Sequence, residues 1–135
     1  MSVIGSFMNS SLPSWTCFID GNPLISNNFS NFDSNNVEIC SLPNITINTT
    51  PNNLTVVASG TTDNPFLFDY IQYVPDNSTI LDNATVEISA LDSQIQYDSR
   101  WNMSLVDGQV QTSVQGASMT FDFVGALPHS FQYFL

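Results

Sequence analysis

The sequence has almost no positive charge. Its 135 residues contain no lysine, one arginine (Arg100) and one histidine (His129) against 12 aspartates and glutamates, a formal net charge of −11. Proteins that bind nucleic acids neutralise phosphates with clustered Lys and Arg, and anionic membrane surfaces attract polybasic segments. The composition therefore excludes a nucleic-acid-binding protein and argues against binding to an anionic membrane surface.

Long apolar runs are also missing. No stretch of 18 apolar residues occurs, so no transmembrane helix is predicted, and the N-terminal MSVIGSFMNSS has neither the basic start nor the apolar run of a signal peptide. Hydrophobic residues nevertheless make up 42% of the chain and aromatic residues 12%, which argues against disorder and for one domain with a core. We expect a fragment of an exported protein whose full gene adds the signal, and whether it adds a membrane anchor stays open.

Cysteine is nearly absent, and Cys17 and Cys40 form the only pair. A bridge between them would close a loop of about 24 residues, worth about 3 kcal/mol by the chain-entropy model. Two free buried thiols are the alternative. A metal site is disfavoured because there is no CxxC motif and the only histidine is distant in sequence. We predict a disulfide and an oxidising compartment.

Sequons for N-glycosylation are abundant. With 15 Asn and 29 Ser plus Thr, chance gives roughly three Asn-x-Ser/Thr motifs. The excess indicates a glycoprotein of the secretory pathway, and the alternative is that an Asn-, Ser- and Thr-rich composition produces sequons freely. The predicted acceptors are Asn9, Asn28, Asn44, Asn48, Asn53, Asn77, Asn83 and Asn102.

The pattern of apolar residues predicts an all-β fold. Helical periodicity is absent, and short β-branched and aromatic runs alternate with Asn, Pro, Gly, Ser and Asp clusters. In the run from Met119 to Phe123 the odd positions are expected to face inward, and the segment 66–74 is expected to be a central strand covered on both faces. This is typical of an antiparallel β-sandwich or jelly roll. The expected strands are 2–7, 15–20, 37–40, 54–59, 66–74, 84–90, 94–97, 109–114 and 118–124.

Two segments are expected to lack strands. Residues 21–36, GNPLISNNFSNFDSNN, are predicted to form a long polar loop whose base the Cys17–Cys40 bridge would hold. This loop is either functional or a glycan-covered spacer. Residues 76–83 are predicted to be a linker between a first part, 1–75, and a second part, 84–135.

Three strings resemble a known family. They are PSWTCFIDGNP (residues 13–23), PFLFDYIQYVP (65–75), and LDSQIQYDSRW with QGASMTFDFVG (91–101 and 115–125). They are similar to the tandem jelly-roll, galactose-binding-like ectodomain repeats of secreted or single-pass membrane proteins of mushroom-forming fungi. The closing half of the family's repeat comes first here and the opening half second. The resemblance implies two half-repeats, 1–75 and 84–135, that pair into one permuted sandwich with a carbohydrate or cell-wall association.

Calcium is the cofactor that the sequence leaves open, and no other cofactor is predicted. The resemblance places the family's acidic opening near Asp82, Asp92 and Asp98, and oxygen-rich side chains suit this ion. Ser89 and Ala90 stand where the family has an acidic pair, and no D-x-D-x-D-G loop occurs. The alternative is that these aspartates serve turns and solubility.

Trp101, Tyr97 and Arg100 are the candidate ligand-binding residues. A saccharide needs an aromatic surface for its C–H face together with polar groups for its hydroxyls. The alternatives are a salt bridge from Arg100 to a nearby aspartate and, for Trp15, packing against the Cys17–Cys40 bridge.

Two tyrosines and one aspartate are expected to serve the fold. Tyr70 and Tyr73 are expected in core and rim packing. Asp69 is expected to bond a neighbouring turn.

No catalytic residue is predicted. His129 adjoins Ser130, but no G-x-S-x-G motif is present, so His129 is interpreted as a loop histidine. A glycoside hydrolase needs paired carboxylates, and Glu38 and Glu87 are the only glutamates. We therefore expect a non-enzymatic extracellular module; the alternatives are a structural glycosylated stalk without ligand, a truncated gene product and, last, a glycoside hydrolase.

Overall fold

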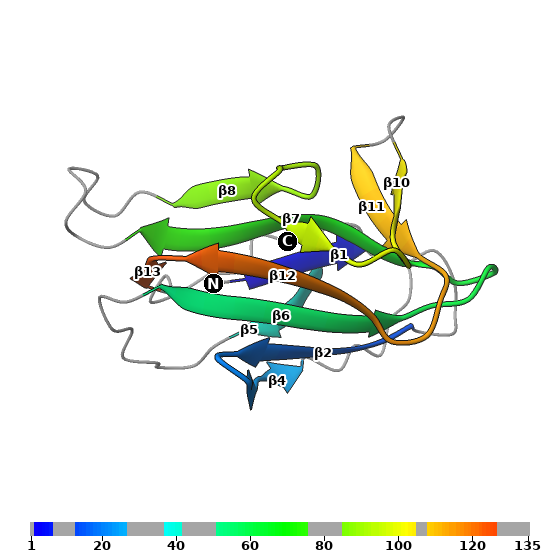
Figure 1. Cartoon of the computed structure of the whole chain (residues 1–135), viewed down its shortest axis with the longest axis horizontal. Helices are drawn as coiled ribbons and strands as arrows, with labels where there is room; N and C mark the ends of the chain where they lie inside the picture. The colour runs from blue at the N-terminus through cyan, green and yellow to red at the C-terminus, as the bar shows by residue number, and fades with distance from the viewer. Residues whose placement is uncertain are drawn as a thin grey trace.

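The chain folds into β-strands packed as two sheets (Figure 1). A computed structural model describes residues 2–6, 13–26, 37–41, 51–75, 85–104 and 108–126. The described strands are β1 (Ser2–Ser6), β2 (Ser14–Ile19), β3 (Asn22–Pro23), β4 (Ile25–Ser26), β5 (Val37–Ser41), β6 (Asn52–Ser59), β7 (Phe66–Pro75), β8 (Val86–Ser89), β9 (Gln96–Tyr97), β10 (Asn102–Ser104), β11 (Gln109–Thr112), β12 (Ala117–Phe123) and β13 (Gly125–Ala126). All their pairings are antiparallel. The predicted all-β antiparallel sandwich is confirmed.

The larger sheet is organised around β7. Its path runs β10-β11-β7-β1-β5-β4, and β8 and β13 also pair with β7. Phe68 pairs with both Gly5 of β1 and Val110 of β11, while Ile71 pairs with both Val3 of β1 and Ile88 of β8. One edge of β7 is therefore covered by β1, and the other by β11 and β8 in turn. The predicted central position of this strand is confirmed, and its first residues are buried on both faces.

The smaller sheet is the more regular one. Its order is β3-β2-β6-β12-β9, and β6 alternates strictly between buried and half-buried side chains. In β12 Met119, Phe121 and Phe123 are buried, as the alternation predicts, while Asp122 is exposed. Period-two patterning gives this sheet one core face and one outer face.

The core lies between the sheets and is held by a covalent link. Cys17 of β2 is bonded to Cys40 of β5, with the two Cα atoms 6.4 Å apart. The bridge therefore joins the smaller sheet to the larger one, and the predicted disulfide is confirmed. Aromatic rings add contacts across the layers: Tyr73 of β7 packs on Phe121 and Phe123 of β12, in agreement with its predicted core role.

Both sheets combine strands from the two parts of the chain. β12 pairs with β6 in the smaller sheet, and β8 and β11 pair with β7 in the larger one. Residues 1–75 and 84–135 thus share one core. The assignment of the two parts to successive repeats stays a prediction, and the linker at 76–83 lies outside the described residues.

The segment 21–36 differs from its prediction as one long loop. Residues 22–23 and 25–26 form β3 and β4, which pair with β2 and β5. Asp20 and Gly21 take left-handed φ values of 50° and 78°, the combination of a two-residue hairpin turn. The Asp-Gly dipeptide is a hairpin signal that the prediction overlooked. Residues 27–36 lie outside the described part.

Candidate functional site

A pocket of about 410 Å³ opens at one end of the sandwich, within the range of small-ligand sites. It lies where β6 ends and β7 begins, at the right of Figure 1. Three chain segments that are distant in sequence meet there: the start of β2, the β6–β7 loop and the β11–β12 turn. The described lining residues are Pro13, Ser14, Ser59, Gly60, Thr61, Asn64 and Gln115.

The described lining side chains are uncharged, and most of them end in a hydroxyl or an amide. Ser14, Ser59 and Thr61 contribute hydroxyls, and Asn64 and Gln115 contribute amides. Each of these groups can both donate and accept a hydrogen bond. None of the described lining residues carries an ionisable side chain, although the chain as a whole has a net charge of −11. These described lining residues therefore form a neutral surface on a strongly acidic protein.

The β6–β7 loop is built by short-range hydrogen bonds. The Thr61 N–H donates to the Asn64 carbonyl oxygen at 2.9 Å, and the Asn64 N–H donates to Thr61 Oγ1 at 3.1 Å. Residue 60, which precedes this turn, has to be a glycine. A Cβ there would overlap the Thr112 carbonyl oxygen and lie 2.7 Å from the Phe66 nitrogen. The lining of the pocket at Gly60 thus depends on close backbone packing.

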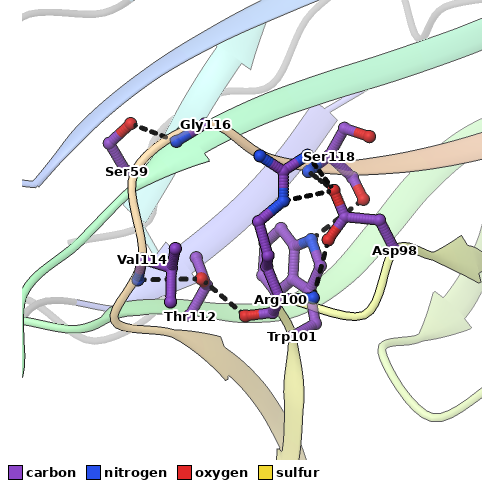
Figure 2. A network of polar contacts seen from close by, with 8 residues as sticks. All are labelled: Ser59, Asp98, Arg100, Trp101, Thr112, Val114, Gly116 and Ser118. Atoms are coloured by element: carbon purple, nitrogen blue, oxygen red, sulfur yellow. Dashed lines mark hydrogen bonds and ion pairs between the residues drawn. The ribbon is translucent and has the colours of Figure 1, made fainter.

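The β11–β12 turn, which forms the pocket wall opposite the β6–β7 loop, is fixed to β6 and β11 (Figure 2). The Gly116 N–H donates to Ser59 Oγ at 2.8 Å, which ties the turn carrying Gln115 to the end of β6. Thr112 is fully buried, and its Oγ1 donates to the Arg100 carbonyl oxygen at 2.9 Å and accepts from the Val114 N–H at 3.2 Å. The wall is therefore positioned before any ligand arrives, which lowers the entropic cost of binding.

Asp98 is the centre of the polar network in Figure 2. Its Oδ2 accepts from the Ser118 N–H at 2.8 Å and from the Arg100 guanidinium at 2.6 and 3.0 Å, and its Oδ1 accepts from the Arg100 N–H at 2.9 Å. Burial raises the pKa of Asp98, but these hydrogen bonds and the guanidinium charge outweigh it and lower the pKa to about 2. Asp98 therefore stays ionised and holds the loop before β10 against β12.

The predicted ligand-binding residues lie in this network and in the core. Trp101 is 8% exposed, packs against the rings of Phe66 and Tyr97, and donates from Nε1 to the Ser118 carbonyl oxygen. The Tyr97 hydroxyl donates to the Ala90 carbonyl oxygen at 2.7 Å, and burial raises its pKa. The structure thus corrects the expectation of an exposed aromatic platform, because tertiary packing covers these rings.

Arg100 forms the salt bridge expected as its alternative role, at 2.6 Å to Asp98. Trp15 donates from Nε1 to the carbonyl oxygen of Ile39, beside Cys40, and its ring lies 5.9 Å from that of Phe66. Neither Arg100 nor Trp15 is among the described lining residues of the pocket.

Asp69 and Tyr70 lie where β11 gives way to β8 along β7. Asp69 Oδ1 accepts from Gln109 Nε2 of β11. The turn after β8 is bonded by the Asp69 carbonyl, which accepts from the Ala90 N–H at 2.9 Å. Burial, followed by the charges of Glu87 and Asp69, raises the pKa of Tyr70.

The candidate calcium ligands are not brought together. Asp92 Oδ1 accepts from the Gln94 N–H within its own turn, Asp98 is engaged by Arg100, and Asp82 lies outside the described residues. Over the described part of the chain, no group of three or more His, Cys, Asp or Glu side chains is arranged to hold a metal. The two described aspartates instead serve local turns.

Other predicted residues are outside the described part. They are Asn9, Asn28, Asn44, Asn48, Asn77 and Asn83 among the glycosylation sites, and His129. Of the predicted acceptors, Asn53 and Asn102 are described. None of the described residues belongs to a helix with the length and apolar character needed to span a membrane.

Comparison with known proteins adds no relative. No family model, curated protein or solved structure matches the chain.

Proposed function

We propose that this chain is a non-enzymatic extracellular binding module that accepts a neutral, hydroxyl-rich saccharide in the pocket between the β6–β7 loop and the β11–β12 turn. The observation that carries the proposal is a described lining without charged side chains, in which five of seven residues carry a hydroxyl or an amide, on a protein of net charge −11. Hydroxyls and amides match the alternating donors and acceptors of a sugar.

The charge distribution favours a neutral ligand over an ionic one. An anionic ligand would be repelled by the field of the whole protein and would meet no basic group among the described lining residues. A cation would be attracted by that field, but the same lining residues offer it no carboxylate. A neutral saccharide needs neither charge.

The proposal of a binding module also follows from the lining chemistry. General acid–base catalysis needs a titratable side chain within reach of the substrate, and glycoside hydrolysis needs two carboxyl groups flanking the bond. The described lining residues supply neither. The pocket is therefore suited to hold a saccharide unchanged.

The disulfide supports the extracellular location, because such bridges form and persist in oxidising compartments. The antiparallel sandwich and the three resembling strings support a jelly roll of the galactose-binding-like type, associated with cell-wall carbohydrate. Fold alone does not specify a ligand, so the pocket chemistry carries the choice.

The test is a saccharide titration. Neutral and uronate-containing oligosaccharides are screened on an array, and the best neutral ligand is titrated calorimetrically into the full chain and into Gln115→Ala. Gln115 is exposed on the pocket wall, so its loss should weaken binding about tenfold, equivalent to about 1.4 kcal/mol. The matched control is Gln96→Ala, an exposed glutamine of β9 outside the described lining, which should bind as the parent does.

The proposal fails if no neutral saccharide binds. It also fails if uronate-containing saccharides bind better than neutral ones, or if both glutamine variants weaken binding equally. Absence of any saccharide binding would favour a structural glycoprotein without ligand.

A further inference from the structure

Two sequons with different surroundings fall within the described residues. Asn53-Leu54-Thr55 lies in β6, the middle strand of the smaller sheet, and Asn102-Met103-Ser104 forms β10, the end strand of the larger sheet. A glycan is bulky and needs a surface that gives it room. The two positions differ sharply in this respect.

The Asn53 side chain is engaged on both of its polar atoms. Its Nδ2 donates to Asp122 Oδ1 on the neighbouring strand at 2.7 Å, and its Oδ1 accepts from Thr55 Oγ1 at 3.0 Å. The Thr55 hydroxyl, which completes the sequon, is thus also used. The Asn53 N–H donates to Asp20 Oδ1 at 2.8 Å. A sugar on Nδ2 would lie against the sheet face and crowd the Asp122 carboxylate.

Asn102 occupies the opposite kind of position. Its side chain is exposed, and the following Met103 is 60% exposed. β10 pairs only with β11 on the sheet path, and together they form the hairpin that projects at the upper right of Figure 1. Within the described part of the chain, no hydrogen bond is made by the side-chain amide of Asn102. A glycan there would extend into solvent without displacing any described contact.

We propose that Asn102 is an occupied N-glycosylation site and that Asn53 is left unmodified. This inference rests on the proposed extracellular function, because the donor, a lipid-diphosphate-linked oligosaccharide, belongs to the secretory pathway. The Asn102 amide nitrogen forms a bond to the anomeric carbon of the first sugar and loses one proton. The bond from that carbon to the diphosphate oxygen breaks, and the lipid diphosphate leaves with the electron pair.

The sequence provides a direct assay. Arg100 is the only trypsin site, since the chain has no other Lys or Arg, and Asn102 is the only sequon after it. The full chain is secreted from eukaryotic cells behind a cleavable signal, reduced, denatured and digested with trypsin. Masses of segments 1–100 and 101–135 are compared before and after removal of N-glycans. A chymotryptic map of segment 1–100 then locates Asn53.

The expected result is a glycan on segment 101–135 that Asn102→Gln removes, together with an unmodified Asn53. The matched Asn53→Gln variant should leave the total glycan mass unchanged.

An unmodified segment 101–135 with glycans on segment 1–100 would overturn the Asn102 assignment while leaving the extracellular proposal standing. A glycan on Asn53 would overturn the other half of the inference. A chain with no glycan at any sequon would overturn the inference, whereas the saccharide titration tests the proposed function separately.

Discussion

The two ends of strand β6 treat polar side chains in opposite ways. At its start, the Asn53 side chain donates to the Asp122 side chain and the Asn53 backbone N–H donates to Asp20 Oδ1, which closes the outer surface of the sheet. At its end, Ser59 and Gly60 support two loops that stand apart and enclose a neutral pocket. Asp20 and Asp122 thus lie at the closed end, whereas the described lining residues of the pocket carry no acidic group. A bond from a backbone N–H to a side-chain oxygen occurs at both ends. The ends differ because a bond between side chains of neighbouring strands covers the sheet surface at the start of β6, whereas the bond at its end holds a turn beside the pocket.

The largest expected effect comes from adding one methyl group near each end of β6, which tests how closely each end is packed. Gly60→Ala should cost about 3 kcal/mol of the free energy of unfolding, because its Cβ would overlap the Thr112 carbonyl oxygen in a packed region. Gly21→Ala at the closed end should cost only about 1 kcal/mol, since nothing lies within 4 Å of its Cβ and only the left-handed φ of 78° opposes it. Urea unfolding of both variants measures the difference.

Equal costs for the two glycine variants would show that the pocket lining at Gly60 is not closely packed. A Gly60→Ala protein that keeps full stability would remove the basis for a preorganised pocket.

The hydrogen bonds of Asp98 provide a second test, at the pocket end of the sandwich. Asp98→Asn should lower the free energy of unfolding at pH 7 by about 2 kcal/mol, because the Ser118 N–H and the Arg100 guanidinium lose their anionic acceptor. Asp92→Asn is the matched control and should cost less than about 0.5 kcal/mol, since an amide oxygen can still accept from the Gln94 N–H. Chemical denaturation at pH 7 measures both.

The lowered pKa of Asp98 also predicts how the stability difference between the parent and Asp98→Asn depends on pH. The pKa of Asp98 falls from 3.8 to about 2 on folding, so the unfolded chain takes up the proton first as pH drops. Its contribution is fully present above pH 3.8 and is lost as pH falls through about 2. The stability gap between the parent and Asp98→Asn should therefore narrow between pH 4 and pH 2. A gap that stays constant over that range would contradict the assignment.

The smallest expected loss of stability comes from removing a single hydrogen bond at each end of β6. Ser59→Ala removes the acceptor of the half-buried Gly116 N–H and should cost about 1 kcal/mol. Asp122→Ala removes an exposed acceptor of Asn53 and should cost less than about 0.5 kcal/mol. Ser59→Ala should also weaken saccharide binding, whereas Asp122→Ala should not. The reverse order of stabilities in thermal unfolding would contradict this ranking.

Local patterns predict the strands well. Each of the nine expected segments overlaps a strand, and the alternation from Met119 to Phe123 is correct, because period-two patterning is a property of neighbouring residues. The short strands β3, β4, β10 and β13 were missed, since two or three residues carry too little pattern. The Cys17–Cys40 bridge is predictable because the chain has only one pair of cysteines.

The candidate site was much harder to predict. Its lining comes from three distant segments, at residues 13–14, 59–64 and 115, and consists of ordinary loop residues without a motif. Trp101 looked like a ligand platform because aromatic residues serve both cores and binding sites, and only tertiary packing decides between them. The salt bridge from Arg100 to Asp98 was foreseeable, because an isolated cation in an acidic chain has partners nearby.

The strands that end the two sheet paths have a consequence for behaviour at high concentration. β3, β4 and β9 are two residues long and β10 is three, whereas the long strands β6, β7 and β12 lie inside their sheets. Such short end strands offer few unpaired backbone groups to a second copy of the chain. Together with the mutual repulsion of molecules that each carry a net charge of −11, these described end strands disfavour edge-to-edge aggregation.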